Sequence, residues 1–133
     1  MVGAESREER PHAPLDPALQ PGIVHRDRVL ITDQHLTRHV GGKGVFATPV
    51  MILFMEQASH NLVAPFLSPE QTTVGYEVHV FHRAPAELGD LIEVESRLVE
   101  VERNRLTFEV RATKDELLLG DGIHRRAVVR ARS

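Results

Sequence analysis

The sequence of 133 residues contains no cysteine. This absence excludes disulfides and thiolate chemistry, and it is typical of proteins that work in the cytoplasm. The chain also lacks any apolar run close to the ~20 residues that a transmembrane helix needs. Residues 1–10 are polar and charged, unlike the apolar middle of a signal peptide. We therefore expect a cytoplasmic protein.

A marked excess of one charge is missing as well. Sixteen Lys and Arg against 19 Asp and Glu give a net charge of −3, so we expect neither nucleic acid nor a membrane as a partner. The length suits one domain with its own hydrophobic core. Residues 1–18 are rich in charge and proline, which predicts a flexible tail. Residues 19–133 are then expected to form the domain.

What the sequence does contain is the pattern of one helix and five strands. Alternating apolar residues predict a first strand at residues 22–32, and the polar, glycine-rich residues 33–44 predict a mobile loop. A helix is predicted at residues 49–64, ended by Pro65. Four more strands are expected at residues 72–82, 91–101, 105–113 and 117–130, the last with a bulge near Gly120 and Gly122. The pattern predicts an α+β fold in which an antiparallel sheet wraps around the long central helix.

The start of that helix is the most informative stretch. Thr48 is a good N-cap residue, and Pro49 suits the first helical position, where its missing N–H costs nothing. Residues 50–55 are apolar without a break, which indicates a helix buried on all sides. Glu56 would then be a buried carboxylate, and such groups concentrate at functional sites. The other interpretation is an ordinary ion pair with His60, one turn further on.

His82 ends the second predicted strand. Two-residue alternation places it on the face that points toward the helix, whereas His79 points away. A titratable ring beside a buried carboxylate is a plausible acid–base pair. The residues expected to share the face of His82 are Val74, Tyr76, Val78 and Val80.

Three stretches resemble one family: VFATPVMILFMEQAS (residues 45–59), GYEVHVFHRAPAELGD (residues 75–90) and GDGIHRRAVV (residues 120–129). They are similar to the fluoroacetyl-CoA-thioesterase-like branch of the hot-dog acyl-CoA thioesterases. The resemblance covers about residues 22–130. It implies the hot-dog fold, hydrolysis of an acyl-CoA thioester to free acid and coenzyme A, and a homodimer that can pair further into a tetramer.

The resemblance also implies the site residues. The family's catalytic Thr, Glu and His correspond to Thr48, Glu56 and His82. Its substrate-binding residues correspond to Gly75 and Arg126, and we add Phe46 and Pro49, the neighbours of Thr48 in the first motif. No cofactor is implied beyond the coenzyme A of the substrate. No metal is expected either, because His35 and His39 have helical ligand spacing but lie in a predicted loop without a third ligand.

A thioesterase needs a nucleophile, a place for the oxyanion and stabilisation of the leaving thiolate. Glu56 would activate a water molecule or attack the carbonyl directly, and the sequence leaves both routes open. Amides at the helix start, with the Thr48 hydroxyl, would hold the oxyanion. His82 would orient the water or assist the thiolate. Eight helical residues separate Thr48 from Glu56 by about 12 Å, so we expect one site to draw on two subunits.

Two other functions fit the same fold. A hot-dog hydratase or dehydratase would act on enoyl thioesters, but it needs an Asp/His pair, and this helix carries a Glu. A non-catalytic acyl-CoA sensor or carrier scaffold would not need Thr48, Glu56 and His82 together. Thiol release from acyl-CoA esters distinguishes the thioesterase from the sensor, and loss of enoyl absorbance reveals the hydratase.

Overall fold

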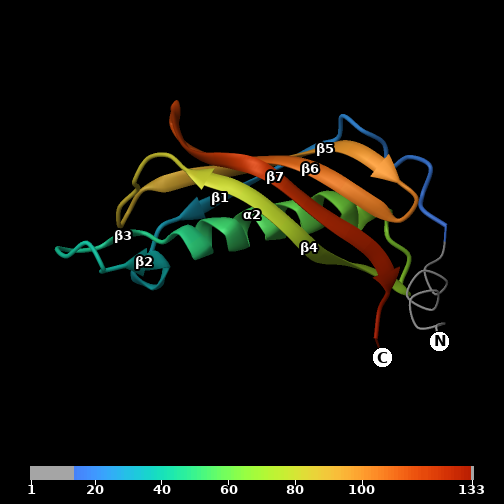
Figure 1. The fold of residues 1–133 in the computed structure, drawn as a ribbon, viewed down its shortest axis with the longest axis horizontal. Coiled ribbons are helices and arrows are strands. Elements are labelled where there is room, and N and C mark those ends of the chain that lie inside the picture. The colour runs from blue at the N-terminus through green and yellow to red at the C-terminus, as the bar shows by residue number, and fades with distance from the viewer. Residues whose placement is uncertain (1–13, 133) are drawn as a thin grey trace.

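The computed structural model describes residues 14–132. One antiparallel sheet, in the order β1-β5-β6-β7-β4, packs against one long helix, α2 (Thr48–Val63). Figure 1 shows α2 lying along one face of this sheet. The expected α+β arrangement is confirmed. The sheet strands are β1 (Val24–Leu30), β4 (Gln71–His82), β5 (Leu91–Glu102), β6 (Arg105–Lys114) and β7 (Leu117–Arg130).

The expected tail falls largely on residues 1–13, which lie outside the described part of the chain. Within the remainder, Leu15 packs against the hydrophobic core, and Leu19 is buried. Pro14 accepts a weak hydrogen bond at its carbonyl from Gln71 Nε2, at 3.5 Å. No helix among the described residues is long and apolar enough to cross a membrane.

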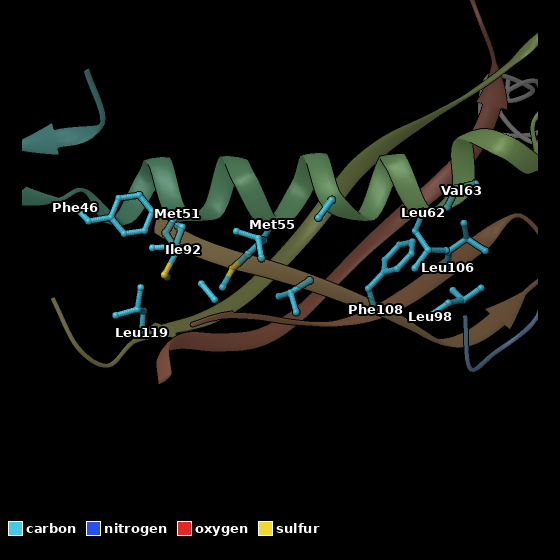
Figure 2. Close-up of a cluster of buried hydrophobic side chains, with 14 of the residues drawn as sticks. Phe46, Met51, Met55, Leu62, Val63, Ile92, Leu98, Leu106, Phe108 and Leu119 are labelled. Atoms are coloured by element: carbon cyan, nitrogen blue, oxygen red, sulfur yellow. The ribbon is translucent and has the colours of Figure 1, made fainter. Parts of the chain in front are cut away.

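The core lies between α2 and the concave face of the sheet. Figure 2 shows Met51 and Met55 of the helix pointing down onto strand residues such as Ile92 and Phe108. The expected inward faces of β5 and β6 are confirmed, because alternate residues of both strands are buried. Removing these side chains from water is the main force that holds the helix on the sheet. The inward residues are Ile92, Val94, Ser96 and Leu98 on β5, and Leu106, Phe108, Val110 and Ala112 on β6.

The helix is not buried on all sides, so that expectation is wrong for the single chain. The sheet covers one face only, and Leu53 on the opposite side is 46% exposed. Glu56 is half-buried rather than fully enclosed. The helix ends at Val63 and passes into the 3-10 turn η2 (Ala64–Phe66), where Pro65 prevents its continuation.

Strand β4 contains a bulge that the sequence pattern did not reveal. Its pairing with β7 shifts between Gly75 and Glu77, which leaves Tyr76 as the extra residue. Consequently Val74 and Tyr76 are 47% and 44% exposed, and their predicted place on the helix face is wrong. The bulge turns Gly75 toward the helix and restores the predicted orientation from Val78 onward.

The segment predicted as a mobile loop has regular structure. It holds the 3-10 turn η1 (Asp33–His35) and β2 (Leu36–Thr37), and β2 pairs with β3 (Val45–Phe46). Gly44, with φ of 92°, lies against the carbonyl of Thr37, so only glycine suits this close approach. The small hairpin packs the chain against the start of α2.

The expected bulge in β7 is present beside Gly120. Pairing with β6 shifts between Ala112 and Thr113, opposite Gly120 and Leu118. A Cβ at Gly120 would lie 2.6 Å from the Met51 sulfur, so this glycine lets α2 approach the sheet. Gly122, in contrast, stays in the regular register.

Candidate active site

Thr48 and His82 meet at the start of the helix. The Thr48 Oγ1 and His82 Nδ1 atoms are 2.7 Å apart, a short hydrogen bond between the first residue of α2 and the last residue of β4. Ala47, not Thr48, is the N-cap of the helix, and Pro49 is the second helical residue. The expected capping role of Thr48 is therefore wrong, because its hydroxyl is engaged with the histidine.

Burial shapes the chemistry of His82. It lowers the pKa of the ring, an effect that the backbone of Ala84 partly opposes, so the neutral imidazole is favoured. The ring lies edge-on to Phe46, with centroids 5.9 Å apart. Its Nε2 atom is buried and has no hydrogen-bond partner of good geometry within residues 14–132. The tautomer of the neutral ring sets the direction of the bond to Thr48: Nδ1 accepts the hydroxyl proton, or Nδ1–H donates to Oγ1 and leaves that proton for a bound group.

Other predicted residues surround this pair in different ways. Phe46 is only 1% exposed and stacks on Phe54, so in the single chain it supports the His82 ring from the core side. Thr48 and Pro49 are exposed. The amides of Val50 and Met51 bond the Ala47 carbonyl. The positive end of the helix dipole thus lies beside an accessible hydroxyl, which suits a developing oxyanion.

Glu56, Gly75 and Arg126 meet two turns further along α2. A Cβ at Gly75 would lie 3.2 Å from Glu56 Oε2 and 3.0 Å from Arg126 Nη1. Glycine at this position therefore allows the carboxylate and the guanidinium to approach the strand. The carboxylate accepts no hydrogen bond from any described residue, including His60, whose ring bonds to Thr73 instead. The simple Glu56–His60 pair is not formed.

Arg126 is held from two sides. Its Nε donates to Thr73 Oγ1 at 2.8 Å, and its Nη2 donates to the Thr73 carbonyl at 3.1 Å. Its Nη1 donates to His124 Nε2 at 3.2 Å. Burial lowers the pKa of Arg126, while the charge of Glu56 raises it. The guanidinium is a fixed positive charge beside Glu56.

Sequence reasoning missed Thr73 and His124 as parts of this region, and it named His60 only as an ion-pair partner of Glu56. His124 and Arg126 are two residues apart on a strand and therefore share a face, which the pattern could have shown. His60 follows Glu56 by one helical turn, so it lies on the same side of α2. Thr73 depended on the β4 bulge and carried no visible signal. Among residues 14–132, no group of three or more acidic or histidine side chains could hold a metal ion.

The chain thus assembles two half-sites on one helix. Thr48 and His82 form the first, and Glu56 with Gly75 and Arg126 forms the second. The eight residues between Thr48 and Glu56 correspond to about 12 Å of helix, so a single small group cannot touch both side chains.

Comparison with known proteins identifies the family. The model of the fluoroacetyl-CoA-specific thioesterase family matches residues 31–132. The chain belongs to this family. The fluoroacetyl-CoA thioesterase of Streptantibioticus cattleyicolor is 36% identical over 85 residues, which are 64% of this chain and 61% of that protein. The match therefore spans less than two thirds of this relative's length.

Solved structures agree with this membership. A crystal structure of a mutant fluoroacetyl-CoA-specific thioesterase, in complex with fluoroacetate and CoA, has a TM-score of 0.77 at 28% identity and covers 84% of this chain and 95% of that chain. A hot-dog-like protein from Thermanaerovibrio acidaminovorans has a TM-score of 0.76 at 21% identity, with 84% of each chain covered. The fold is the hot-dog fold.

Proposed function

We propose that this family member is an acyl-CoA thioesterase, which hydrolyses an acyl-CoA thioester to the free acid and coenzyme A. The observation that carries the proposal is the 2.7 Å contact between Thr48 Oγ1 and His82 Nδ1 at a helix start. It places a hydroxyl, a neutral imidazole and a helix N-terminus at one point, as the carbonyl of a thioester requires. Family membership supports the same conclusion.

Thr48 and His82 act on the carbonyl and the leaving group. When His82 Nδ1–H donates to Thr48 Oγ1, the hydroxyl keeps its own proton for the oxyanion that forms when the carbonyl is attacked, and the first-turn dipole stabilises the same charge. The imidazole of His82 orients the hydroxyl and assists the departing thiolate. When the carbon–sulfur bond breaks, the thiolate leaves and takes up one proton of the consumed water to give coenzyme A, while the water oxygen stays with the acyl group as the free acid.

Glu56 supplies the other half of the reaction. Its carboxylate has no hydrogen bond to the rest of the described chain, so it is free to accept a proton from water or to attack the carbonyl itself. Arg126 lies beside it, with its Nη1 atom near the same point of strand β4 that Glu56 Oε2 approaches. Both routes consume one water and yield the same acid.

We propose that the complete site forms between two copies of the chain in a homodimer. The half-sites are too far apart in one chain to meet at one carbonyl. Strand β4 lies at an edge of the sheet, and edge strands readily pair with another chain. Val74 and Tyr76 on this edge and Leu53 on the helix are large exposed apolar residues. A two-fold pairing would bury these residues. It would also create two equivalent sites, each with the Thr48–His82 pair from one chain and Glu56 from the other.

The remaining proposals concern what accompanies the reaction. Coenzyme A enters as part of the substrate, and no resident cofactor or metal takes part in the proposed steps. The chain has no cysteine, which agrees with action in the cytoplasm.

Release of free thiol from a panel of acyl-CoA esters tests the function. The protein has no thiol of its own, so a thiol reagent reports coenzyme A without background. We expect thiol release to match acid formation one to one. Binding of acyl-CoA without thiol release would instead indicate a sensor, and loss of enoyl absorbance from an enoyl-CoA would indicate a hydratase.

A further inference from the structure

A polar pocket of about 510 Å³ lies beside Glu56. Only one of its lining residues, Leu53, is apolar. The surroundings of the Thr48–His82 pair are different, because there the rings of Phe46 and Phe54 stack on each other. The pocket is lined by Leu53, Glu56, Gln57, His60, Asn61, Thr73 and Arg126.

Arg126 presents fixed hydrogen-bond donors to this pocket. A guanidinium carries five N–H groups and no acceptor. Three of them are used, two by Thr73 and one by His124. One N–H on each terminal nitrogen therefore remains. Because the three bonds hold the plane of the group, these two donors are preorganised.

The partners of His124 define its protonation. Its Nε2 must accept, because Arg126 Nη1 can only donate, and its Nδ1 donates to the Glu77 carbonyl at 2.9 Å. The ring is thus neutral. Burial, with the charge of Arg126, lowers its pKa and agrees with this state, although the Glu77 carbonyl and the charge of Glu56 act in the opposite direction.

The same reasoning gives the orientation of His60. Thr73 is buried, and its hydroxyl already accepts a bond from Arg126. Its own proton needs an acceptor, since a buried unsatisfied O–H is costly. His60 Nδ1, at 2.7 Å, is that acceptor. The neutral ring then carries its proton on Nε2, on the side of the ring away from Thr73. Burial and the charge of Arg126 lower the pKa of His60 and favour this state.

The inner part of the pocket therefore offers N–H donors from two residues, Arg126 and His60. Gln57 and Asn61 are exposed at its rim, and the proposed reaction uses Glu56. An alkyl chain would leave the N–H groups of Arg126 and His60 without hydrogen-bond partners, and buried donors without partners strongly reduce the affinity for such a substrate. The amide N–H groups of a pantetheine arm would find no acceptor on Arg126 or His60, and apart from the reactive Glu56 only the side-chain oxygens of Gln57 and Asn61 at the rim could accept from them. A group that only accepts hydrogen bonds fits best.

We propose that this pocket binds the acyl group, and that the preferred substrates carry a second oxygen acceptor on a short acyl chain, as in oxoacyl or dicarboxylic monothioesters of coenzyme A. This inference rests on the thioesterase function proposed above. His60 is the specificity-determining residue, because its Nε2 proton contacts the acceptor oxygen while Arg126 supplies the charge.

Four-carbon esters provide a matched test. The kcat/KM of the wild-type protein is measured with butyryl-CoA, 3-oxobutyryl-CoA and succinyl-CoA, after subtraction of spontaneous hydrolysis. We expect at least one oxygen-bearing ester to exceed butyryl-CoA about tenfold, the effect of one or two good hydrogen bonds. Equal values for all three, or a preference for butyryl-CoA, would overturn the inference. Failure to hydrolyse any ester would instead overturn the proposed function.

Variants of His60 assign the effect to this pocket. We expect His60→Leu to reduce the preference about fivefold through loss of one donor, while His60→Gln, which keeps an N–H, retains most of it. His79→Leu is the matched control, because His79 lies on the opposite face of the sheet and is exposed. Thermal unfolding of each variant checks that the fold is intact. An unchanged preference in folded His60→Leu, or an equal loss in His60→Gln, would contradict the role of the Nε2 proton.

Thioesters of N-acetylcysteamine separate the acyl group from the pantetheine arm. They keep the acyl group and lack most of coenzyme A. With these truncated esters we expect the wild-type protein still to prefer oxygen-bearing acyl groups over butyryl, and His60→Leu still to reduce that preference. If His60→Leu slows all coenzyme A esters equally and has no effect on the truncated esters, the pocket holds the pantetheine arm and the proposal is wrong.

Discussion

The two half-sites on α2 differ in how their reactive groups are held. At the helix start, Thr48 and His82 bond directly to each other, next to buried aromatic rings. In the middle of the helix, Glu56 bonds to no described residue, although the Arg126 beside it is held by three hydrogen bonds. The first half-site is complete within one chain. In the second half-site Arg126 is fixed by hydrogen bonds, whereas the Glu56 carboxylate makes no hydrogen bond to the described residues.

This difference is informative about mechanism. A group that orients a substrate benefits from being fixed, since preorganised dipoles need no rearrangement during the reaction. A base or nucleophile must keep a free lone pair for water or carbonyl carbon. In the reaction proposed above, positioning falls to the helix start and bond formation to the helix middle. Four experiments test that division, and a fifth tests the burial of the histidines around both half-sites.

The largest effect is expected for Glu56→Gln. The amide keeps the shape of the side chain and removes the base or nucleophile, so kcat should fall at least ~100-fold. Circular dichroism and thermal unfolding should stay close to wild type, because the carboxylate makes no hydrogen bond to the described chain. Near-normal hydrolysis by this variant would refute the assignment of bond formation to the helix middle.

Mixing two inactive variants tests whether the half-sites combine across subunits. After full exchange of equal amounts of Thr48→Val and Glu56→Gln chains, half of the dimers are mixed, and each mixed dimer has one intact site. Activity should return to about a quarter of the wild-type value. Wild-type chains exchanged with either variant serve as the control. Mixtures that stay inactive while these controls remain active would show that each chain carries its own complete site.

The pair His82→Ala and His79→Ala tests the helix start. Loss of the His82 ring frees the Thr48 hydroxyl and should lower kcat at least about tenfold, with a changed acid limb of the pH–rate profile. His79 is exposed on the far face and pairs with Glu77, so its removal should have little effect. Equal losses in the two variants would mean that the strand orientation does not matter for activity.

A smaller effect is expected for Gly75→Ala. The new Cβ would lie within 3.2 Å of His124, Arg126 and Glu56 atoms, so the buried His124 ring and the ends of the other two side chains must move. We expect kcat/KM to fall about fivefold because the carboxylate is displaced, and the unfolding temperature to fall as well because the His124 and Arg126 hydrogen bonds are disturbed. Activity equal to wild type would show that the position of Glu56 tolerates this shift.

The smallest expected change is in stability on mild acidification. Burial lowers the pKa values of His60, His82 and His124 from 6.5, so the unfolded chain binds these protons more readily. The free energy of unfolding should therefore fall as the pH drops below about 6.5. Glu77 and Asp90 also have lowered pKa values, but as carboxylates they lose their contribution at lower pH.

Urea unfolding at about pH 7.5 and about pH 5.5 measures this slope. His124→Gln removes one of the three groups and should flatten it. Stability that rises on acidification would show that protonated histidines gain partners in the folded state.

Much of the fold followed from sequence patterns. Alternation predicted the inward residues Ile92 to Leu98 on β5 and Leu106 to Ala112 on β6, because no register shift falls within these stretches. The hairpin turn at Arg103, with φ of 57°, was located by its position between two such runs. The pattern failed in the first half of β4. The bulge adds one residue to the strand, so residues before it point to the opposite face from the one that alternation predicts. The pattern also failed for the short strands β2 and β3, which are too brief to show a period.

For the site, the sequence determined the spacing of the candidate catalytic residues along the helix. Thr48 and Glu56 are eight positions apart, and helical geometry alone implies that they cannot meet within one chain. Alternation correctly predicted that His82 points toward the helix, because the bulge lies before Val78 and does not disturb the strand from Val78 to His82. These results depend on local periodicity, which a single sequence contains.

Only the tertiary structure decided which partners these residues have. Thr48 bonds to His82 instead of capping its own helix, because β4 ends where α2 begins. Glu56 meets Arg126 through Gly75, since the bulge turns a glycine inward between them. The one-sided cover of α2 by the sheet leaves that carboxylate half-buried. Such contacts join residues far apart in the chain, and no local pattern contains the distances between them.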